Sequence, residues 1–258
     1  MNFFEKTHII ENGAYMMKNV FLLTLLISLP MGVFAANITL SAGGGGLLGY
    51  TFTRYTLEGG NAQSVQSMDR LNYAGFLFFD ATYGELSVLI QGGNNSYAEK
   101  MTEGSFVFSD GKGKGYETSL GFSLLGKFPL GINERITWFP MLGVEYQIAL
   151  VERREPDGAS VYDRSKGKGI SVADTDKDGN SYPLSAWNSF WINIGAGLDF
   201  TISGPLFLRS ELLFGFRLPT GYEMGALEMV KKTLDVDNPK LMGLTGSPAL
   251  KIGIGYRF

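Results

Sequence analysis

The final strand of the chain is the feature that most constrains its fold. Successive side chains of a strand point to opposite faces, so residues 251–258 divide into two sets. The first set is entirely apolar and consists of Ile252, Ile254, Tyr256 and Phe258. The second set is small or cationic and consists of Lys251, Gly253, Gly255 and Arg257. This division is typical of a barrel strand that faces lipid on one side and a polar lumen on the other. The alternative is an edge strand of a soluble sheet.

The amino end has the pattern of a secretory signal peptide. Lys18 precedes an apolar run that ends in small residues suited to cleavage. We therefore expect a signal peptide over residues 1–35 and a single mature domain over residues 36–258. The acidic residues before the run do not fit a signal peptide, so we expect translation to start at Met16 or Met17.

The chain has no cysteine, which excludes disulfides and a lipid-modified cysteine. Beyond the leader, no stretch approaches the length of uncharged apolar sequence that a membrane-spanning helix needs. An exported chain that spans a membrane without helices must be a closed barrel, because backbone polar groups cannot be left unpaired in hydrocarbon. The net charge of −3 is too small to indicate nucleic acid as a partner.

Apolar residues at alternate positions predict eight strands in the mature chain. These are Ile38–Arg54, Leu71–Ala81, Leu86–Gly92, Tyr116–Gly126, Ile136–Leu150, Phe190–Ile202, Leu206–Leu218 and Ala249–Phe258. The expected connections alternate between short turns and long loops. Short turns are expected near 82–85, 127–135 and 203–205, and long loops near 55–70, 93–115, 151–189 and 219–248. This asymmetry predicts an all-β fold, an eight-stranded antiparallel transmembrane β-barrel with short periplasmic turns and long extracellular loops.

In strand count, loop asymmetry and the terminal Phe258, the chain resembles the small eight-stranded bacterial outer-membrane barrels, the OmpA transmembrane, OmpX and OmpW kind. The row of Ile252, Ile254, Tyr256 and Phe258 also resembles the C-terminal signal that the barrel assembly machinery reads during insertion. The resemblance implies a location in the lipid bilayer of the outer membrane. We expect a monomer, and the resemblance does not settle activity.

If the apolar positions face lipid, the alternate positions face the lumen. The charged members of the inward set are Asp80, Glu117, Glu145, Asp199, Arg209, Glu211, Arg217, Lys251 and Arg257. The near balance of acids and bases predicts ion pairs in a filled interior. A narrow conduit that opens when such pairs break is the alternative. Inward apolar residues either fill the interior or line a hydrophobic passage like the one the OmpW resemblance implies; they are Phe76, Phe78, Phe139, Trp191 and Leu213.

Catalysis by imidazole is not expected in the mature protein. The only histidine, His8, lies in the expected leader. This excludes Ser-His-Asp chemistry and histidine metal sites. Glu145 and Glu211 could act as an acid–base pair, but ion pairing with Arg209 or Arg217 is the favoured interpretation. We expect no enzyme.

The expected loop at 151–189 contains the one pattern that suggests a metal. Asp174, Asp176 and Asp178 precede a glycine, as in the first half of an EF-hand loop. Ser185 stands where that motif needs a bidentate glutamate, so a weak calcium site is an alternative to a solvated acidic loop. No other cofactor is expected.

Two further loop patterns remain open. Lys-Gly-Lys pairs, Lys112/Lys114 and Lys166/Lys168, are either solvated tips or a basic spot for polyanions such as anionic glycolipid or host glycosaminoglycan. Apolar residues at helical spacing over 226–234 suggest a short helix on the barrel rim.

Two functions follow from this pattern. The first is a non-catalytic surface protein whose long loops contact host or environmental ligands. The alternative is an OmpW-like narrow channel or transporter for small or hydrophobic solutes. In both cases aromatic residues should mark the membrane interfaces. We expect Tyr50, Phe52, Tyr73, Tyr146 and Trp187 on the outer side, and Phe79, Trp138, Phe200, Tyr256 and Phe258 on the inner side.

Overall fold

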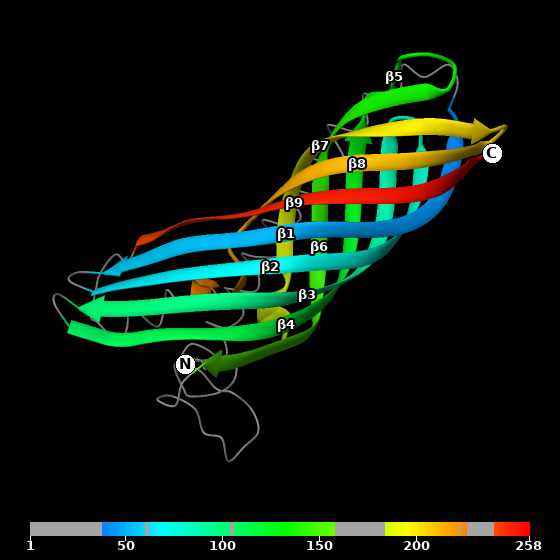
Figure 1. Cartoon of the computed structure of the whole chain (residues 1–258). Coiled ribbons are helices and arrows are strands. Elements are labelled where there is room, and N and C mark those ends of the chain that lie inside the picture. Colours follow the sequence, from blue (N-terminus) through cyan, green and yellow to red (C-terminus); the bar gives the residue numbers. More distant parts are fainter. Residues whose placement is uncertain (1–37, 60–61, 104–105, 158–183, 222, 226–239) are drawn as a thin grey trace, which may run out of the picture.

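The structure, a computed structural model, describes residues 38–59, 62–103, 106–157, 184–221, 223–225 and 240–258. The expected leader over residues 1–35 lies outside this part. Nearly all of the described chain is strand (Figure 1). The strands are β1 (Leu40–Gly59), β2 (Ala62–Ala81), β3 (Gly84–Glu103), β4 (Phe106–Lys127), β5 (Leu130–Gly131), β6 (Ile136–Asp157), β7 (Ser189–Ser203), β8 (Leu206–Arg217) and β9 (Lys240–Arg257), with a 3-10 turn, η4 (Leu184–Trp187), before β7.

Eight long strands close into an antiparallel ring. Each pairs with its neighbours in the order β4-β3-β2-β1-β9-β8-β7-β6, and β4 pairs with β6 to complete the circle. The first and last strands meet along β1 and β9, where Leu47 lies opposite Lys251. The expectation of an eight-stranded antiparallel barrel is therefore confirmed. The short β5, which the sequence did not predict, pairs with the start of β6 inside the turn expected at 127–135. Among the described residues, no helix is long and apolar enough to cross a membrane.

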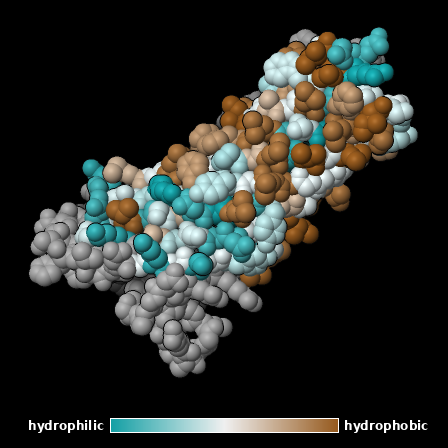
Figure 2. Space-filling model, viewed as in Figure 1, coloured by the Kyte–Doolittle hydropathy of each residue, from teal (hydrophilic) through white to brown (hydrophobic). Residues whose placement is uncertain are grey.

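The outward positions form an apolar belt around the end of the barrel that carries the C-terminus. Figure 2 shows hydrophobic surface gathered over this end and hydrophilic surface over the other. The exposed side chains of the belt include Leu77, Leu86, Val88, Ile90, Leu142, Ile194, Leu212, Ile252 and Ile254. Of the expected aromatic markers, Tyr50, Tyr73, Phe79, Trp138, Phe200, Tyr256 and Phe258 are exposed, whereas Phe52, Tyr146 and Trp187 are partly covered. The alternate residues of these strands therefore divide between the outer and inner faces as predicted.

The prediction of long loops at 55–70 and 93–115 is wrong. Those residues continue the β1–β2 and β3–β4 hairpins, which pair almost to their tips. In the same way, β6 continues to Asp157 and β9 begins at Lys240. A membrane crossing needs only about 9–11 residues of a tilted strand. The 20 residues of β1 and of β2 therefore carry the barrel well beyond the apolar belt, as Figure 1 shows for β1 to β4.

These extensions escaped detection because their outward faces are polar. In β3 the large outward apolar side chains end at Ile90, and Gly92, Asn94 and Ser96 follow on the same face. Once both faces of a strand are polar, no hydrophobic alternation remains to mark it. The helix expected over 226–234 lies outside the described residues.

The glycine run of β1 lets two backbones approach closely. A Cβ atom added at Gly45 would lie 2.0 Å from the carbonyl oxygen of Ile252 in β9. At the adjacent Gly46, the nearest atom to an added Cβ is the Ala74 carbonyl oxygen at 3.8 Å. Crowding at the barrel wall therefore holds for Gly45 and not for Gly46.

This difference gives a matched test of barrel closure. We expect Gly45→Ala to destabilise the folded barrel by about 1–3 kcal/mol, the usual effect of overpacking, because the β1–β9 pairing must shift. Gly46→Ala should leave stability nearly unchanged. Urea unfolding of the two variants in detergent, followed by tryptophan fluorescence, measures the difference. Equal midpoints for the two variants would contradict the close approach at Gly45.

Candidate functional site in the barrel lumen

The nine charged residues that the sequence assigned to the lumen all lie on the inner wall, but they do not form one network. Six of them gather toward the end that carries the C-terminus: Asp80, Asp199, Arg209, Glu211, Lys251 and Arg257. Glu117 and Arg217 belong to two separate ion pairs farther along the lumen. Glu145 has no ion pair among the described side chains.

Arg209 is the centre of the larger group, which we call the Arg209 cluster. Its Nε donates to Asp199 Oδ1 at 2.7 Å, and its Nη2 donates to Asp199 Oδ2 at 2.7 Å, so this pair is bidentate. Nη1 donates to Glu85 Oε2 at 2.7 Å, and Nη2 also donates to Asp80 Oδ2 at 2.6 Å. One guanidinium thus holds carboxylates from β2, β3 and β7, with only 2% of its surface exposed. A rigid, planar group with several donors is suited to such a role.

The remaining members balance the charge of the cluster. Lys127 pairs with Asp80, and its Nζ lies 3.6 Å from Glu85 Oε2. Lys251 Nζ lies 3.7 Å from Glu211 Oε2. Arg257 Nη2 lies 3.8 Å from Asp199 Oδ2, which completes four acids and four bases: Asp80, Glu85, Asp199 and Glu211 against Lys127, Arg209, Lys251 and Arg257.

Sequence reasoning missed Glu85 and Lys127 because both stand next to turns. The signal that would have found them is parity. Glu85 shares the inward parity of Ser87 and Leu89, and Lys127 shares that of Leu125.

Aromatic rings surround the Arg209 guanidinium. The centroids of Phe78, Phe207 and Phe139 lie 4.6, 5.1 and 5.2 Å from Arg209 Cζ. Glycines opposite them provide the room, since an added Cβ at Gly197 would lie 2.2 Å from the Phe139 ring. The inward apolar residues from the sequence are all buried: Phe76, Phe78, Phe139, Trp191 and Leu213. Trp191 and Leu213 also line a cavity of the lumen.

The outer part of the lumen is polar and held by smaller groups. Arg70 pairs with Glu117, and Arg217 pairs with Glu223. Thr220 and Glu223 also exchange hydrogen bonds, because the Thr220 backbone N–H donates to Glu223 Oε2 at 2.8 Å. Arg70 could have been found from its parity with Asn72. Glu223 lies in an expected loop, where no periodicity exists.

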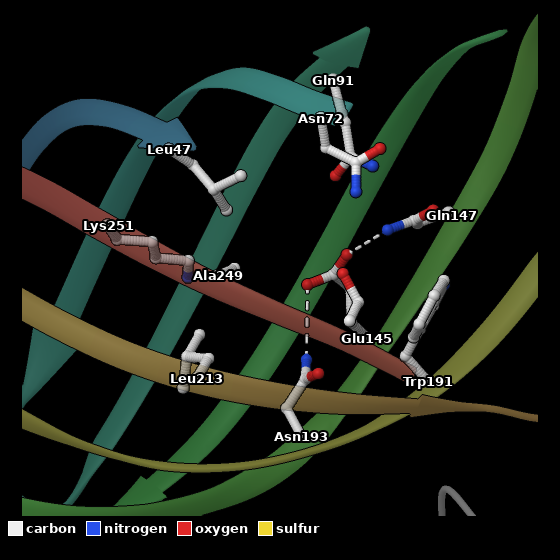
Figure 3. Close-up of a pocket in the computed structure, with 11 residues that line it drawn as sticks. Leu47, Asn72, Gln91, Glu145, Gln147, Trp191, Asn193, Leu213, Ala249 and Lys251 are labelled. Atoms are coloured by element: carbon white, nitrogen blue, oxygen red, sulfur yellow. Dashed lines mark hydrogen bonds between the residues drawn. The ribbon is translucent and has the colours of Figure 1, made fainter. Parts of the chain in front are cut away.

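Glu145 corrects one expectation, because it pairs with neither Arg209 nor Arg217. Its carboxylate accepts hydrogen bonds from Gln147 Nε2 at 2.6 Å and from Asn193 Nδ2 at 3.4 Å (Figure 3). It lines a cavity of about 30 Å³ with a mixed wall, which includes the polar Asn72, Gln91 and Lys251 and the apolar Leu47, Trp191 and Leu213. A cavity of this size has room for water.

The other sequence assignments have separate outcomes. The row of Ile252, Ile254, Tyr256 and Phe258 faces outward, as a lipid-facing row should, while its role as an insertion signal remains a prediction. Asp174, Asp176 and Asp178 lie outside the described residues, as do Lys166 and Lys168. Within the described ranges, no group of three or more His, Cys, Asp and Glu side chains is arranged to hold a metal ion.

Among known proteins, only solved structures are similar to this chain. No protein-family model matches the chain, and no curated protein matches it. The solved structures similar to it include the outer membrane protein OprG from Pseudomonas aeruginosa, with 12% identity, a TM-score of 0.40, and coverage of 85% of this chain and 95% of that one. The outer membrane protease OmpT from Escherichia coli is similar at 10% identity and a TM-score of 0.38, over 87% and 98% of the two chains.

The attachment invasion locus protein Ail of Yersinia pestis, solved with a heparin analogue, is similar at 13% identity and a TM-score of 0.28, over 85% and 99% of the two chains. These three proteins include a protease and a protein crystallised with a polyanion. Likenesses of this extent do not assign an activity to this chain.

Proposed function

We propose that this chain is a non-catalytic barrel of a bacterial outer membrane that keeps its lumen closed and presents its outer end to host or environmental ligands. The observation that carries the proposal is the Arg209 cluster. Its central guanidinium is buried, holds three carboxylates and is surrounded by three aromatic rings. Charges arranged in this way fill the lumen and stabilise its closed state.

The outer end supplies the surface for contact. Strands β1 to β4 and β6 extend past the apolar belt, so a sheet of mostly polar residues projects beyond the membrane (Figure 2). Lys112 and Lys114 are exposed on this sheet. The register places these two positions opposite positions 157 and 155 of β6. We propose no single ligand class for this end.

Two observations support the absence of catalysis. The only histidine is His8, in the expected leader. The two carboxylates considered for acid–base chemistry have structural contacts, since Glu211 lies near Lys251 and Arg209 while Glu145 accepts two amide hydrogen bonds.

A conductance measurement tests the closed lumen. The refolded chain in a planar lipid bilayer should give no channel steps, because the Arg209 cluster and its rings block the passage. Reproducible steps of uniform size would overturn the closed lumen and favour the narrow channel for small or hydrophobic solutes.

The Arg209 cluster should also dominate stability. Arg209→Ala leaves carboxylates buried without their partner, and breaking a buried pair in this way costs about 3–5 kcal/mol. The matched control is Arg54→Ala, because Arg54 pairs with Asp69 at 2.8 Å on the exposed face, where such pairs contribute about 0–1 kcal/mol. Urea unfolding compares the two variants. A loss for Arg209→Ala no larger than that for Arg54→Ala would show that the cluster does not hold the barrel closed.

An adhesion assay tests the proposed contact between the outer end and host or environmental ligands. Bacteria expressing the full chain should adhere to host cells or extracellular matrix, and a variant lacking residues 158–183 should adhere less at equal surface level. Surface level is measured with an epitope tag, and the heat-induced gel shift confirms that the variant barrel is folded. Unchanged adhesion of the folded variant would remove this segment from the contact surface.

A further inference from the structure

The segment that follows β8 reaches back into the barrel through one side chain. Arg217, the last residue of β8, has the same inward parity as Arg209 and Leu213. Glu223, which lies beyond the strand, is paired with Arg217 and is only 8% exposed. A carboxylate on a connecting segment normally stays in water, because burying a charge is costly. The inward position of Glu223 therefore calls for a reason other than filling the space between the strands.

Contacts within the segment and contacts to the wall together fix Glu223 in this position. The Thr220 backbone N–H donates to Glu223 Oε2 at 2.8 Å, and the Glu223 backbone N–H donates to Thr220 Oγ1 at 3.3 Å. This exchange is a capping box, which orders the first turn of a helix. Arg217 Nη2 donates to Glu223 Oε1 and also to Thr245 Oγ1 of β9, the latter at 3.3 Å. We call Arg217, Thr220, Glu223 and Thr245 the Glu223 latch.

The inner wall at the level of the latch is shielded from water. Thr245 Oγ1 donates to Thr53 Oγ1 of β1 at 3.1 Å, and the two threonines are 6% and 1% exposed. Trp191 of β7, which lies opposite Arg217 in the register, is also buried, and its Nε1 donates to Ser189 Oγ at 2.9 Å. These residues lie where β7 begins and β8 ends, and water would reach them in an open tube. Their burial shows that the outer mouth of the lumen is covered at this level.

The latch is built to move more easily than the Arg209 cluster. Arg209 donates through all three nitrogens of its guanidinium to carboxylates on strands of the ring. Among the described residues, Arg217 donates only through Nη2, and its buried Nε has no hydrogen-bond partner. Glu223 lies on a connecting segment and not on a strand of the ring. The latch can therefore open without breaking any pairing between strands, whereas the Arg209 cluster is fixed to the ring.

The latch and the Arg209 cluster lie on opposite sides of the lumen cavity. Along β8, Leu213 lies between Arg217 of the latch and Arg209 of the cluster. Along β9, Ser247 comes directly after Thr245 on the inner face. Leu213 and Ser247 both line the cavity of about 30 Å³. The cavity is thus bounded by the latch toward the outer end and by the cluster toward the end that carries the C-terminus.

We propose that the Glu223 latch is a second closure of the lumen, at its outer mouth, and that it opens independently of the Arg209 cluster. The proposal rests on the closed lumen proposed above and adds a step that controls access from the outer side. When Glu223 leaves Arg217, the segment after β8 moves away from the mouth. Small water-soluble molecules then reach the cavity, while the Arg209 cluster still blocks the passage through the barrel.

Labelling of an introduced thiol tests the latch, because the chain has no cysteine of its own. Ser247→Cys places a thiol in the wall of the cavity. The refolded full chain in detergent is treated with a charged methanethiosulfonate reagent, and the rate of labelling is measured by mass spectrometry. Ser247→Cys alone should be labelled slowly. Adding Glu223→Ala should speed labelling at least tenfold, because the rate follows the fraction of molecules in which the mouth is open.

Glu58→Ala is the matched control, because it removes a carboxylate near the outer end whose hydrogen bond with Gln63 is exposed. Combined with Ser247→Cys, it should leave the labelling rate unchanged. Arg217→Met breaks the latch from the strand side and serves if Glu223→Ala does not refold, which the heat-induced gel shift reveals. It should speed labelling in the same way.

Conductance in a planar lipid bilayer separates the two closures. The Glu223→Ala variant should give no channel steps, because the Arg209 cluster remains in place. Channel steps from this variant, in a chain whose wild type is silent, would overturn the independence of the two closures. Rapid labelling of Ser247→Cys alone, or equal rates with and without Glu223→Ala, would overturn the latch itself while leaving the closed lumen to its own test.

Discussion

The closed ring of backbone hydrogen bonds is the constraint on which the rest of this structure depends. Once β4 pairs with β6 and β1 with β9, no strand edge is left unpaired at the level of the apolar belt. A strand in such a ring has only two environments for its side chains, outside and inside. The apolar row that ends at Phe258 and the charged row that contains Lys251 follow directly from this division.

The narrow interior then decides which inward residues are tolerated. A small ring leaves little room, so aromatic rings of the inner wall pack against glycines such as Gly197 and Gly255. Charged side chains at this depth need partners, and Arg209 alone is the partner of Asp80, Glu85 and Asp199. Glu145, a carboxylate without an ion pair among the described side chains, instead accepts hydrogen bonds from Gln147 and Asn193 where the packing leaves a cavity.

Sequence alone predicted the ring, the parity of its strands and the nine inward charges, because lipid on one side imposes a regular alternation. It failed where that alternation ends. Beyond Ile90, most of the outward residues of β3 are small or polar, and hairpins were mistaken for loops at 55–70 and 93–115. Side-chain pairing was also beyond reach, since the contacts of Glu145 depend on how far each strand is shifted along its neighbour. Asp80 and Arg209, which are far apart in sequence, meet only through that register.

The central claim, that alternate residues of these strands meet lipid, is tested most directly by inserting arginine at two outward positions. Ile254 lies in the apolar belt, where an arginine costs about 2–4 kcal/mol, whereas Ser96 lies outward in the polar extension of β3. Folding into lipid vesicles is scored by the heat-induced gel shift. We predict that Ile254→Arg fails to insert or inserts far less, while Ser96→Arg inserts like the wild type. Equal insertion of the two variants would contradict the assignment of the belt to the membrane.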